Sequence, residues 1–411
     1  MLRSMYSGIS GLKNLQTKLD VIGNNVANVN TYGFKKSRVT FSDTMNQTIS
    51  GASAATENRG GTNAKQVGLG STIATIDTIH SQSSLQTTGR DLDLAVSGDG
   101  YFVVKQGDAL SYTRAGNFYL DDNGTLVNSS GSKVQAYKVD ANGKLSNTIG
   151  DVAVNVNAVL PAVATTKVTV SENLAADAIE GSVFSQQIKV VDASGVEQAI
   201  TIYFMKTGEN SWGVYNQDPT INSEEDEAEQ KLELTFDEDG KSEIDIEEIT
   251  LSLPKAENSE DEEQEELALN FDFSALTQVK GTTTALVNPN GNKEGKLESF
   301  NFGASGEING IYSNGKIVTL GQLAIAKFSN ASGLTKTGGS TFQESINSGT
   351  ANIGVAGDGR GTLASGSLEM SNVDLSEEFT EMIVAQRGFQ SNSRIITTSD
   401  EILQELVNLK R

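Results

Sequence analysis

The chain has 411 residues and a formal net charge of −22, with no cysteine and a single histidine, His80. These counts exclude disulfides, thiolate chemistry and cysteine-based metal sites. With one histidine, the chain also has almost no residues for the catalytic triad of a hydrolase. The acidic balance argues against nucleic acid as a partner, because a nucleic-acid-binding face needs basic residues. At about 150 residues per domain, the length suggests roughly three domains.

The N-terminus predicts a long amphipathic helix. Apolar residues recur every three or four positions over residues 2–29, which is the spacing of a helix with a coiled-coil-like seam. Such a helix is about 44 Å long at 1.5 Å per residue, and Gly33 is its expected stop. The predicted seam consists of Leu2, Met5, Ile9, Leu12, Leu15, Leu19, Ile22, Val26 and Val29.

A polar stretch of small residues, 51–71, follows this helix and shows no periodicity. Such a composition is typical of a linker or an extended arm. We therefore assign residues 34–75, together with 355–371, to an extended linker or arm.

Strand signals begin near Thr72 and return after residue 296. Alternating apolar residues and glycine-containing turns are typical of strands and hairpins. Two strand-rich blocks that flank a different middle region indicate one β domain, 76–148 and 296–354, interrupted by an insertion. The expected strands are 91–96, 101–104 and 323–328, and the expected hairpin turns are Asn123-Gly124, Asn142-Gly143 and Asn314-Gly315.

The middle region, 149–295, reads as an inserted outer β domain. It holds all four prolines and Trp212, the only tryptophan, and strands are expected around 168–170, 188–191 and 199–204. Segment 224–272 carries 21 acidic and 3 basic residues, a net charge of −18. We interpret this segment as a solvated, self-repelling surface, with weak binding of divalent cations as the alternative.

The C-terminus predicts a second long helix, about 54 Å if it runs unbroken to Leu409. Asp374 followed by Glu377 indicates a capping box at its start. The apolar face is too wide for one partner helix, which favours assembly with neighbouring chains over folding back on the same domain. The terminal segments 1–33 and 372–411 would together form one terminal helical domain. The predicted seam consists of Leu375, Phe379, Met382, Phe389, Ile396 and Leu403.

Three short features resemble chemical sites. Segment 357–361 lacks the Lys-Ser/Thr pair of a phosphate loop, so we interpret it as a turn. Segment 121–124 resembles part of a calcium loop, but Ser132 stands where the last glutamate ligand is needed. His80 has no second histidine or cysteine beside it, so we expect a surface or turn role. We expect no catalytic residue, no cofactor and no metal, and therefore no enzyme.

No apolar run approaches the roughly 20 residues that span a bilayer, so we expect no membrane insertion. The N-terminus carries Arg3 but no apolar core segment, so we expect no Sec-type signal peptide.

Two terminal motifs resemble those of the bacterial flagellar rod and hook family. Residues 25–34 resemble its N-terminal signature, and residues 368–374, followed by 385–387 and Ser393, resemble its C-terminal motif. The resemblance covers roughly residues 1–145 and 296–411. The N-terminal motif is carried by Asn25, Asn28, Thr31, Gly33 and Phe34.

Together these patterns predict a mixed, mainly β fold. The N- and C-terminal helices form a coiled-coil-like inner domain, and two β-rich domains are nested by insertion. The resemblance implies a structural subunit of the hook, a self-assembling, curved hollow tube that acts as a universal joint between rod and filament. The alternatives are a distal rod protein or, from a different class, a secreted β-rich adhesin.

The resemblance also implies partners and a location. The chain would polymerise with many copies of itself and contact flagellar rod proteins, the hook cap protein and the hook–filament junction protein. It would be exported through the flagellar type III apparatus to the extracellular hook.

Overall fold

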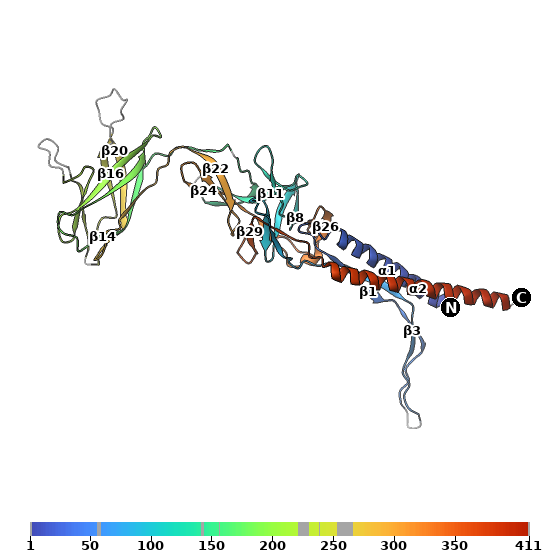
Figure 1. The fold of residues 1–411 in the computed structure, drawn as a ribbon. Coiled ribbons are helices and arrows are strands. Elements are labelled where there is room, and N and C mark those ends of the chain that lie inside the picture. Colours follow the sequence, from blue (N-terminus) through green and yellow to red (C-terminus); the bar gives the residue numbers. More distant parts are fainter. Residues whose placement is uncertain are drawn as a thin grey trace. The chain divides into compact units, whose positions relative to one another are not determined.

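The computed structural model describes residues 2–55, 59–140, 144–155, 157–220, 230–237, 239–252 and 266–409. The chain divides into two compact units, which are described separately below. Unit 1 comprises Met1–Asn155, Phe300–Asn309 and Thr319–Arg411, and unit 2 comprises Val156–Ser299 and Gly310–Val318. The fold is mainly β with one long helix near each end, as the sequence predicts (Figure 1). The expected turn at Asn142-Gly143 and much of the acidic segment lie outside the described residues.

The two terminal helices of unit 1, α1 (Leu2–Ala27) and α2 (Leu375–Leu409), lie side by side and antiparallel (blue and red in Figure 1). Lys18 of α1 forms an ion pair with Glu381 of α2. Helix α2 has the predicted bounds, and Asp374 Oδ1 accepts a hydrogen bond from the Ser376 backbone N–H at 2.8 Å, so it caps the helix.

Helix α1 ends earlier than predicted, at Ala27, and not just before Gly33. Asn28 donates its side-chain amide to the carbonyl oxygen of Asn24 at 2.9 Å, and Thr31 donates its hydroxyl to Asn28 at 3.1 Å. These local side-chain bonds compete with continued helix and convert residues 28–33 into a series of turns.

The segment after α1 forms two antiparallel pairs of strands. Strand β1 (Ser37–Asp43) pairs with β4 (Ser71–Thr78), and β2 (Asn46–Ser50) pairs with β3 (Lys65–Gly68). Every residue of β2 and β3 is exposed. The sequence predicted no regular structure in 51–71, because a polar ribbon with no buried face lacks the alternation that marks a strand.

The sheet at the centre of unit 1 is built around β7, with the strand order β24-β11-β7-β8-β27-β26. Its core includes the aromatic rings of Tyr101, Tyr112, Phe328 and Phe342. The strands are β7 (Tyr101–Gln106), β8 (Ala109–Thr113), β11 (Lys133–Val139), β24 (Ile317–Leu323), β26 (Thr335–Gly338) and β27 (Thr341–Gln343).

Shorter strands complete unit 1. The strand expected at 91–96 begins only at Leu94, because Asp93 closes a turn by donating its backbone N–H to the Arg90 carbonyl at 2.9 Å. The expected turn at Asn123-Gly124 joins β9 to β10. These strands are β5 (Leu85–Thr87), β6 (Leu94–Ser97), β9 (Tyr119–Leu120), β10 (Leu126–Val127), β12 (Leu145–Asp151), β25 (Ile325–Lys327), β28 (Asn352–Gly354), β29 (Thr362–Ser365) and β30 (Ser367–Glu369).

Unit 2 is a sandwich of two four-stranded sheets, ordered β15-β16-β17-β18 and β19-β20-β14-β21. One apolar core, which includes Trp212 and Phe204 from the first sheet and Phe271 from the second, fills the space between them. The sheets hold β14 (Lys167–Ala175), β15 (Val183–Val191), β16 (Glu197–Lys206), β17 (Ser211–Tyr215), β18 (Gln230–Thr235), β19 (Ile246–Ser252), β20 (Glu266–Val279) and β21 (Leu286–Pro289). Unit 2 also holds β13 (Val159–Leu160), while β22 (Gly295–Phe302) and β23 (Glu307–Tyr312) each have residues in both units.

Candidate functional site

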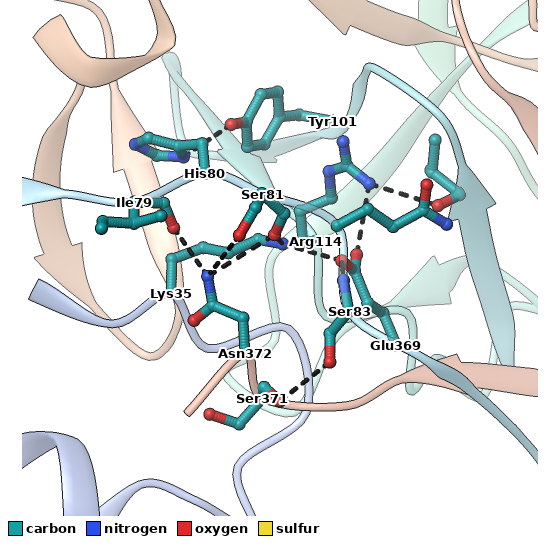
Figure 2. A network of polar contacts seen from close by, with 12 residues as sticks. Lys35, Ile79, His80, Ser81, Ser83, Tyr101, Arg114, Glu369, Ser371 and Asn372 are labelled. Carbon is teal, nitrogen blue, oxygen red and sulfur yellow. Dashed lines mark hydrogen bonds and ion pairs between the residues drawn. The ribbon is translucent and has the colours of Figure 1, made fainter. Parts of the chain in front are cut away.

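A buried ion network ties the segment after α1 to the segment before α2. Lys35 Nζ lies 2.7 Å from Glu369 Oε1, and Arg114 Nη1 lies 3.2 Å from Glu369 Oε2 (Figure 2). The Lys35 and Glu369 side chains are fully buried, and that of Arg114 is 3% exposed. We call these three residues the junction triad.

Backbone groups complete the junction triad. Lys35 donates to the Ser81 carbonyl at 2.8 Å, and Arg114 Nη2 donates to the Gly98 carbonyl at 2.7 Å. Glu369 accepts a further bond from the Ser83 backbone N–H at 3.0 Å. The carboxylate is therefore shared by two cations and one amide, each held by a different segment of the chain.

A second contact crosses the same junction. The Asn372 side chain accepts a bond from the Lys36 backbone N–H at 2.7 Å. It also donates to the Ile79 carbonyl at 2.8 Å (Figure 2). Asn25 donates to Glu378 at 3.1 Å and exchanges bonds of 2.8 and 3.0 Å with the Ser37 backbone. These bonds fix the two helices to the strands that follow and precede them.

The junction triad has an excess of positive charge, because two cations share one carboxylate. Burial lowers the pKa of Lys35, and the ion pair with Glu369 opposes that shift. A buried charge that loses its partner is costly, so the triad is stable only as a unit.

Gly33 belongs to this junction, and no other residue type fits there. Its φ is +67°, a left-handed conformation, and its backbone N–H donates to the Glu369 carbonyl at 2.8 Å. A Cβ atom on Gly33 would lie 2.4 Å from the backbone nitrogen of Ala115. The predicted motif glycine is thus explained by both conformation and space.

The other predicted motif residues surround the same turn. Asn25 is buried, Asn28 and Thr31 bond to each other, and Phe34 is half-buried with Lys336 Nζ 5.0 Å from its ring centre. The motif therefore acts as a connector, and its members lie together.

His80 does not have the surface or turn role that the sequence suggested. Its Nδ1 lies 2.7 Å from the Tyr101 hydroxyl, and its ring packs 5.2 Å from that of Phe342. Its Nε2 is buried with no hydrogen-bond partner among the described residues. Burial, and then the positive charges of Lys35, Lys336 and Arg114, lower the pKa of His80 to about 4. Sequence spacing could not reveal this, because the aromatic partners are distant in the chain.

The predicted seam residues of α1 are mostly half-buried, and their assignment to assembly stays a prediction. Ile22 is buried, Ile9 is 39% exposed, and the side chain of Leu2 lies outside what the structure describes. The remaining predicted residues are half-buried: Met5, Leu12, Leu15, Leu19, Val26 and Val29.

The predicted seam residues of α2 divide between two faces. Met382, Ile396 and Leu403 are half-buried. Leu375, Phe379 and Phe389 remain exposed, at 40%, 49% and 38%. Their assignment to assembly stays a prediction.

The side of α2 that faces α1 includes several small or polar residues. Glu378, Ala385 and Ser399 are buried there at intervals of seven, and Asn392 lies between the last two. The helices approach closely: a Cβ atom on Gly11 would lie 2.8 Å from the side chain of Asn392, and one on Gly388 would lie 3.0 Å from Leu15. The contact also uses a bulky residue of α2, because Ile396 Cγ1 would lie 3.4 Å from a Cβ atom on Gly8.

Nine large apolar side chains on the described part of α2 remain exposed in the single chain. Exposed apolar side chains in such number are typical of an interaction surface. Its exposed members, which we call the outer face of α2, are Leu375, Phe379, Ile383, Val384, Phe389, Ile395, Ile402, Val407 and Leu409.

Sequence reasoning missed Lys35, Arg114 and Glu369 as site residues. Each lies in or beside a stretch that the family motifs cover, but an isolated charged residue gives no sign that it is buried. Among the described residues, no group of three or more histidine, aspartate or glutamate side chains is placed to hold a metal ion. The described helices include none that is long and apolar enough to cross a membrane.

Comparisons with protein families match four parts of the chain. The descriptions are "Flagella basal body rod protein" for residues 5–35 and "Flagellar hook protein FlgE/F/G D1 domain" for 95–173. "Flagellar basal body protein FlaE D2 domain" matches 165–292, and "Flagellar basal body rod FlgEFG protein C-terminal" matches 364–409.

Relatives match the whole length of the chain. The flagellar hook protein FlgE of Borreliella burgdorferi is 41% identical, and the flagellar basal-body rod protein FlgG of Bacillus subtilis is 40% identical, with full coverage of both chains in each case. The crystal structure of Helicobacter pylori flagellar hook protein FlgE2 has a TM-score of 0.50 at 14% identity, over 69% of this chain and all of that chain. That last likeness is one of fold.

Proposed function

The chain belongs to the family of flagellar hook and rod proteins, and we propose that it is the structural subunit of the hook. The observation that carries this function is the full-length match to a hook protein, together with the uncovered outer face of α2. The role is structural: the subunit builds a curved hollow tube that passes torque from rod to filament.

Assembly supplies what the single chain lacks. Burying a large apolar side chain contributes about 1.5–3 kcal/mol, and the outer face of α2 offers several such side chains per subunit. Neighbouring copies of α1 and α2 are the partners that suit this face, because they carry complementary helical surfaces. The terminal helices would therefore line the inside of the tube.

The remaining partners follow from the family. They are the flagellar rod proteins, the hook cap protein, the hook–filament junction protein and the flagellar type III export apparatus. The resulting location is the extracellular part of the flagellum.

A truncation tests the proposal. Deleting residues 2–20 removes most of α1 but retains Ile22, Asn25 and the junction triad. We expect this variant to keep folded β units by circular dichroism and to form no polymer in electron micrographs. Normal tubes from the truncated chain would contradict the proposal.

A distal rod protein is the second candidate, because the Bacillus relative is named a rod protein. Unit 2 does not separate the two candidates, because the rod protein of Bacillus subtilis is matched over its whole length by the whole of this chain. The full-length match to a hook protein at 41% identity favours the hook. The curvature of the purified polymer separates the two: curved tubes support the hook, and straight ones support the rod.

A further inference from the structure

Unit 2 carries a basic groove at one edge of its sandwich. The groove has a volume of about 430 Å³ and is lined by Lys189, Lys293 and Lys316 around one carboxylate, Glu197. Glu197 lies 3.1 Å from Lys189 Nζ and 3.0 Å from Lys293 Nζ, while Lys316 Nζ donates to the Asn292 side chain at 2.9 Å. The Lys189 side chain is 71% exposed and that of Lys293 48% exposed. The groove thus holds three accessible ammonium groups and one carboxylate, which pairs with two of them, in a chain whose net charge is −22.

The same unit carries an acidic edge. Residues 230–252, which include β18 and β19, hold eight acidic and two basic residues. The described acidic side chains in this range are all exposed. They are Glu233, Asp237, Asp239, Glu243, Asp245, Glu247 and Glu248.

The sheet topology puts these two features on opposite edges of the sandwich. Lys189 lies on β15, an outer strand of one sheet, and Lys293 follows β21, an outer strand of the other; these two strands lie against each other. Strands β18 and β19 are the opposite outer strands, and they also lie against each other. The basic groove and the acidic edge are therefore separated by the width of the sheets.

We propose that the basic groove of one copy binds the acidic edge of unit 2 in a second copy of this chain. Complementary charge selects this occupant, because the groove has an excess of cations and the acidic edge an excess of anions. Two different patches on opposite edges make a heterologous contact, which repeats in one direction and builds an open polymer. The inference deepens the proposed hook function and rests on it.

Cross-linking in the assembled polymer tests this contact directly. Unlabelled and ¹⁵N-labelled chains are mixed before polymerisation and treated with a zero-length carbodiimide, which joins a lysine to a touching carboxylate. We expect mixed-isotope peptides that link Lys293 or Lys316 to the 243–248 segment. Polymer that yields no such links, or only links within one chain, would overturn the proposal and leave the hook function standing. Absence of any polymer would instead contradict the hook function.

A charge reversal gives a second, independent measurement. Lys316→Glu leaves the ion pairs of Glu197 intact, and we expect it to raise the critical concentration for polymerisation by about 3- to 10-fold. Lys280→Glu, an exposed lysine elsewhere in unit 2, is the matched control and should change it less than about twofold. Adding Glu247→Lys and Glu248→Lys to Lys316→Glu should restore the original value.

Salt separates this contact from a purely repulsive acidic surface. If the acidic edge binds the groove, screening weakens the contact, so the difference between the parent chain and Lys316→Glu should shrink as salt rises. If that edge serves only to prevent strand pairing between sheets, Lys316→Glu will match the Lys280→Glu control at every salt concentration, and the proposal fails.

Discussion

At the scale of single residues, Glu369 is a position where we expect substitution to reduce stability strongly. Its carboxylate neutralises two buried cations, and Glu369→Gln would keep the size of the side chain but remove the charge. We expect a loss of about 3–5 kcal/mol in the unfolding free energy of unit 1, because Lys35 and Arg114 would remain buried without a counter-charge.

The chain offers an internal control for this measurement. Trp212 is the only tryptophan and lies in the core of unit 2, so its fluorescence follows unit 2 alone. In urea, the circular dichroism transition of unit 1 should shift while the fluorescence transition stays in place. Glu298→Gln, at an exposed position, should move neither. Equal shifts of both transitions would show that the triad does not act locally.

His80 gives unit 1 a dependence on pH. Its pKa is about 4 in the folded chain and 6.5 as the ordinary value, so the unfolded chain binds the proton more readily between these limits. The stabilisation is complete above pH 6.5 and is lost as the pH falls towards 4, a change of about 2–3 kcal/mol. Urea unfolding at a series of pH values measures it.

The variant His80→Gln should remove this slope. Among the described carboxylates of unit 1, Asp151 has its pKa lowered by hydrogen bonds from Gln135 and Lys133, so it titrates below this range. If the unfolding free energy of His80→Gln keeps the same slope against pH between 6.5 and 4, another group causes the pH dependence.

At the scale of secondary-structure elements, the two faces of α2 should respond differently to mutation. Phe389 is 38% exposed in the single chain, so Phe389→Ala should change monomer stability by less than about 1 kcal/mol. If the site is fully buried in the polymer, the same change costs about 3–5 kcal/mol per subunit there. Sedimentation of polymer against chain concentration measures this difference.

Ala385 contrasts with Phe389, because it lies on the side of α2 that faces α1. It is fully buried against α1, so Ala385→Leu overpacks the helix pair and should destabilise the monomer by about 1–3 kcal/mol.

A Phe389→Ala polymer as stable as the parent would show that the outer face stays uncovered.

The sequence predicted both helices, the cap at Asp374 and most strands, because periodicity and capping are local signals. It could not show which stripe of α2 meets α1. Bulky apolar residues at intervals of seven form the stronger pattern, yet Ala385 and Ser399 are the more deeply buried positions and Asn392 is the residue that lies against Gly11. A hydrophobic pattern identifies a buried stripe but does not say whether the same chain or a neighbour buries it.

At the scale of the whole molecule, the nested insertion was predictable from composition, since the prolines, the tryptophan and the acidic segment all fall between the two strand-rich blocks. The four-part division by residue range stays a prediction. The junction triad was not predictable: Lys35 and Glu369 lie 334 residues apart in the chain, and no spacing rule connects them. Only the fold brings these charges together.

The same organisation predicts that unit 1 can assemble without the insertion. Deleting residues 157–298 and joining the ends with a short glycine-serine linker would keep Val152 and Val154, which are buried in unit 1. It would remove the acidic segment of net charge −18 and, with it, repulsion between neighbouring outer domains. The outer face of α2 and the junction triad would be untouched.

We therefore expect tubes that are straighter or less stable than those of the full chain, with the unit 1 unfolding transition unchanged. Electron microscopy of the shortened chain checks the first expectation and circular dichroism the second. A folded unit 1 that forms no tubes would show that the inserted unit, and not the helix pair alone, drives assembly.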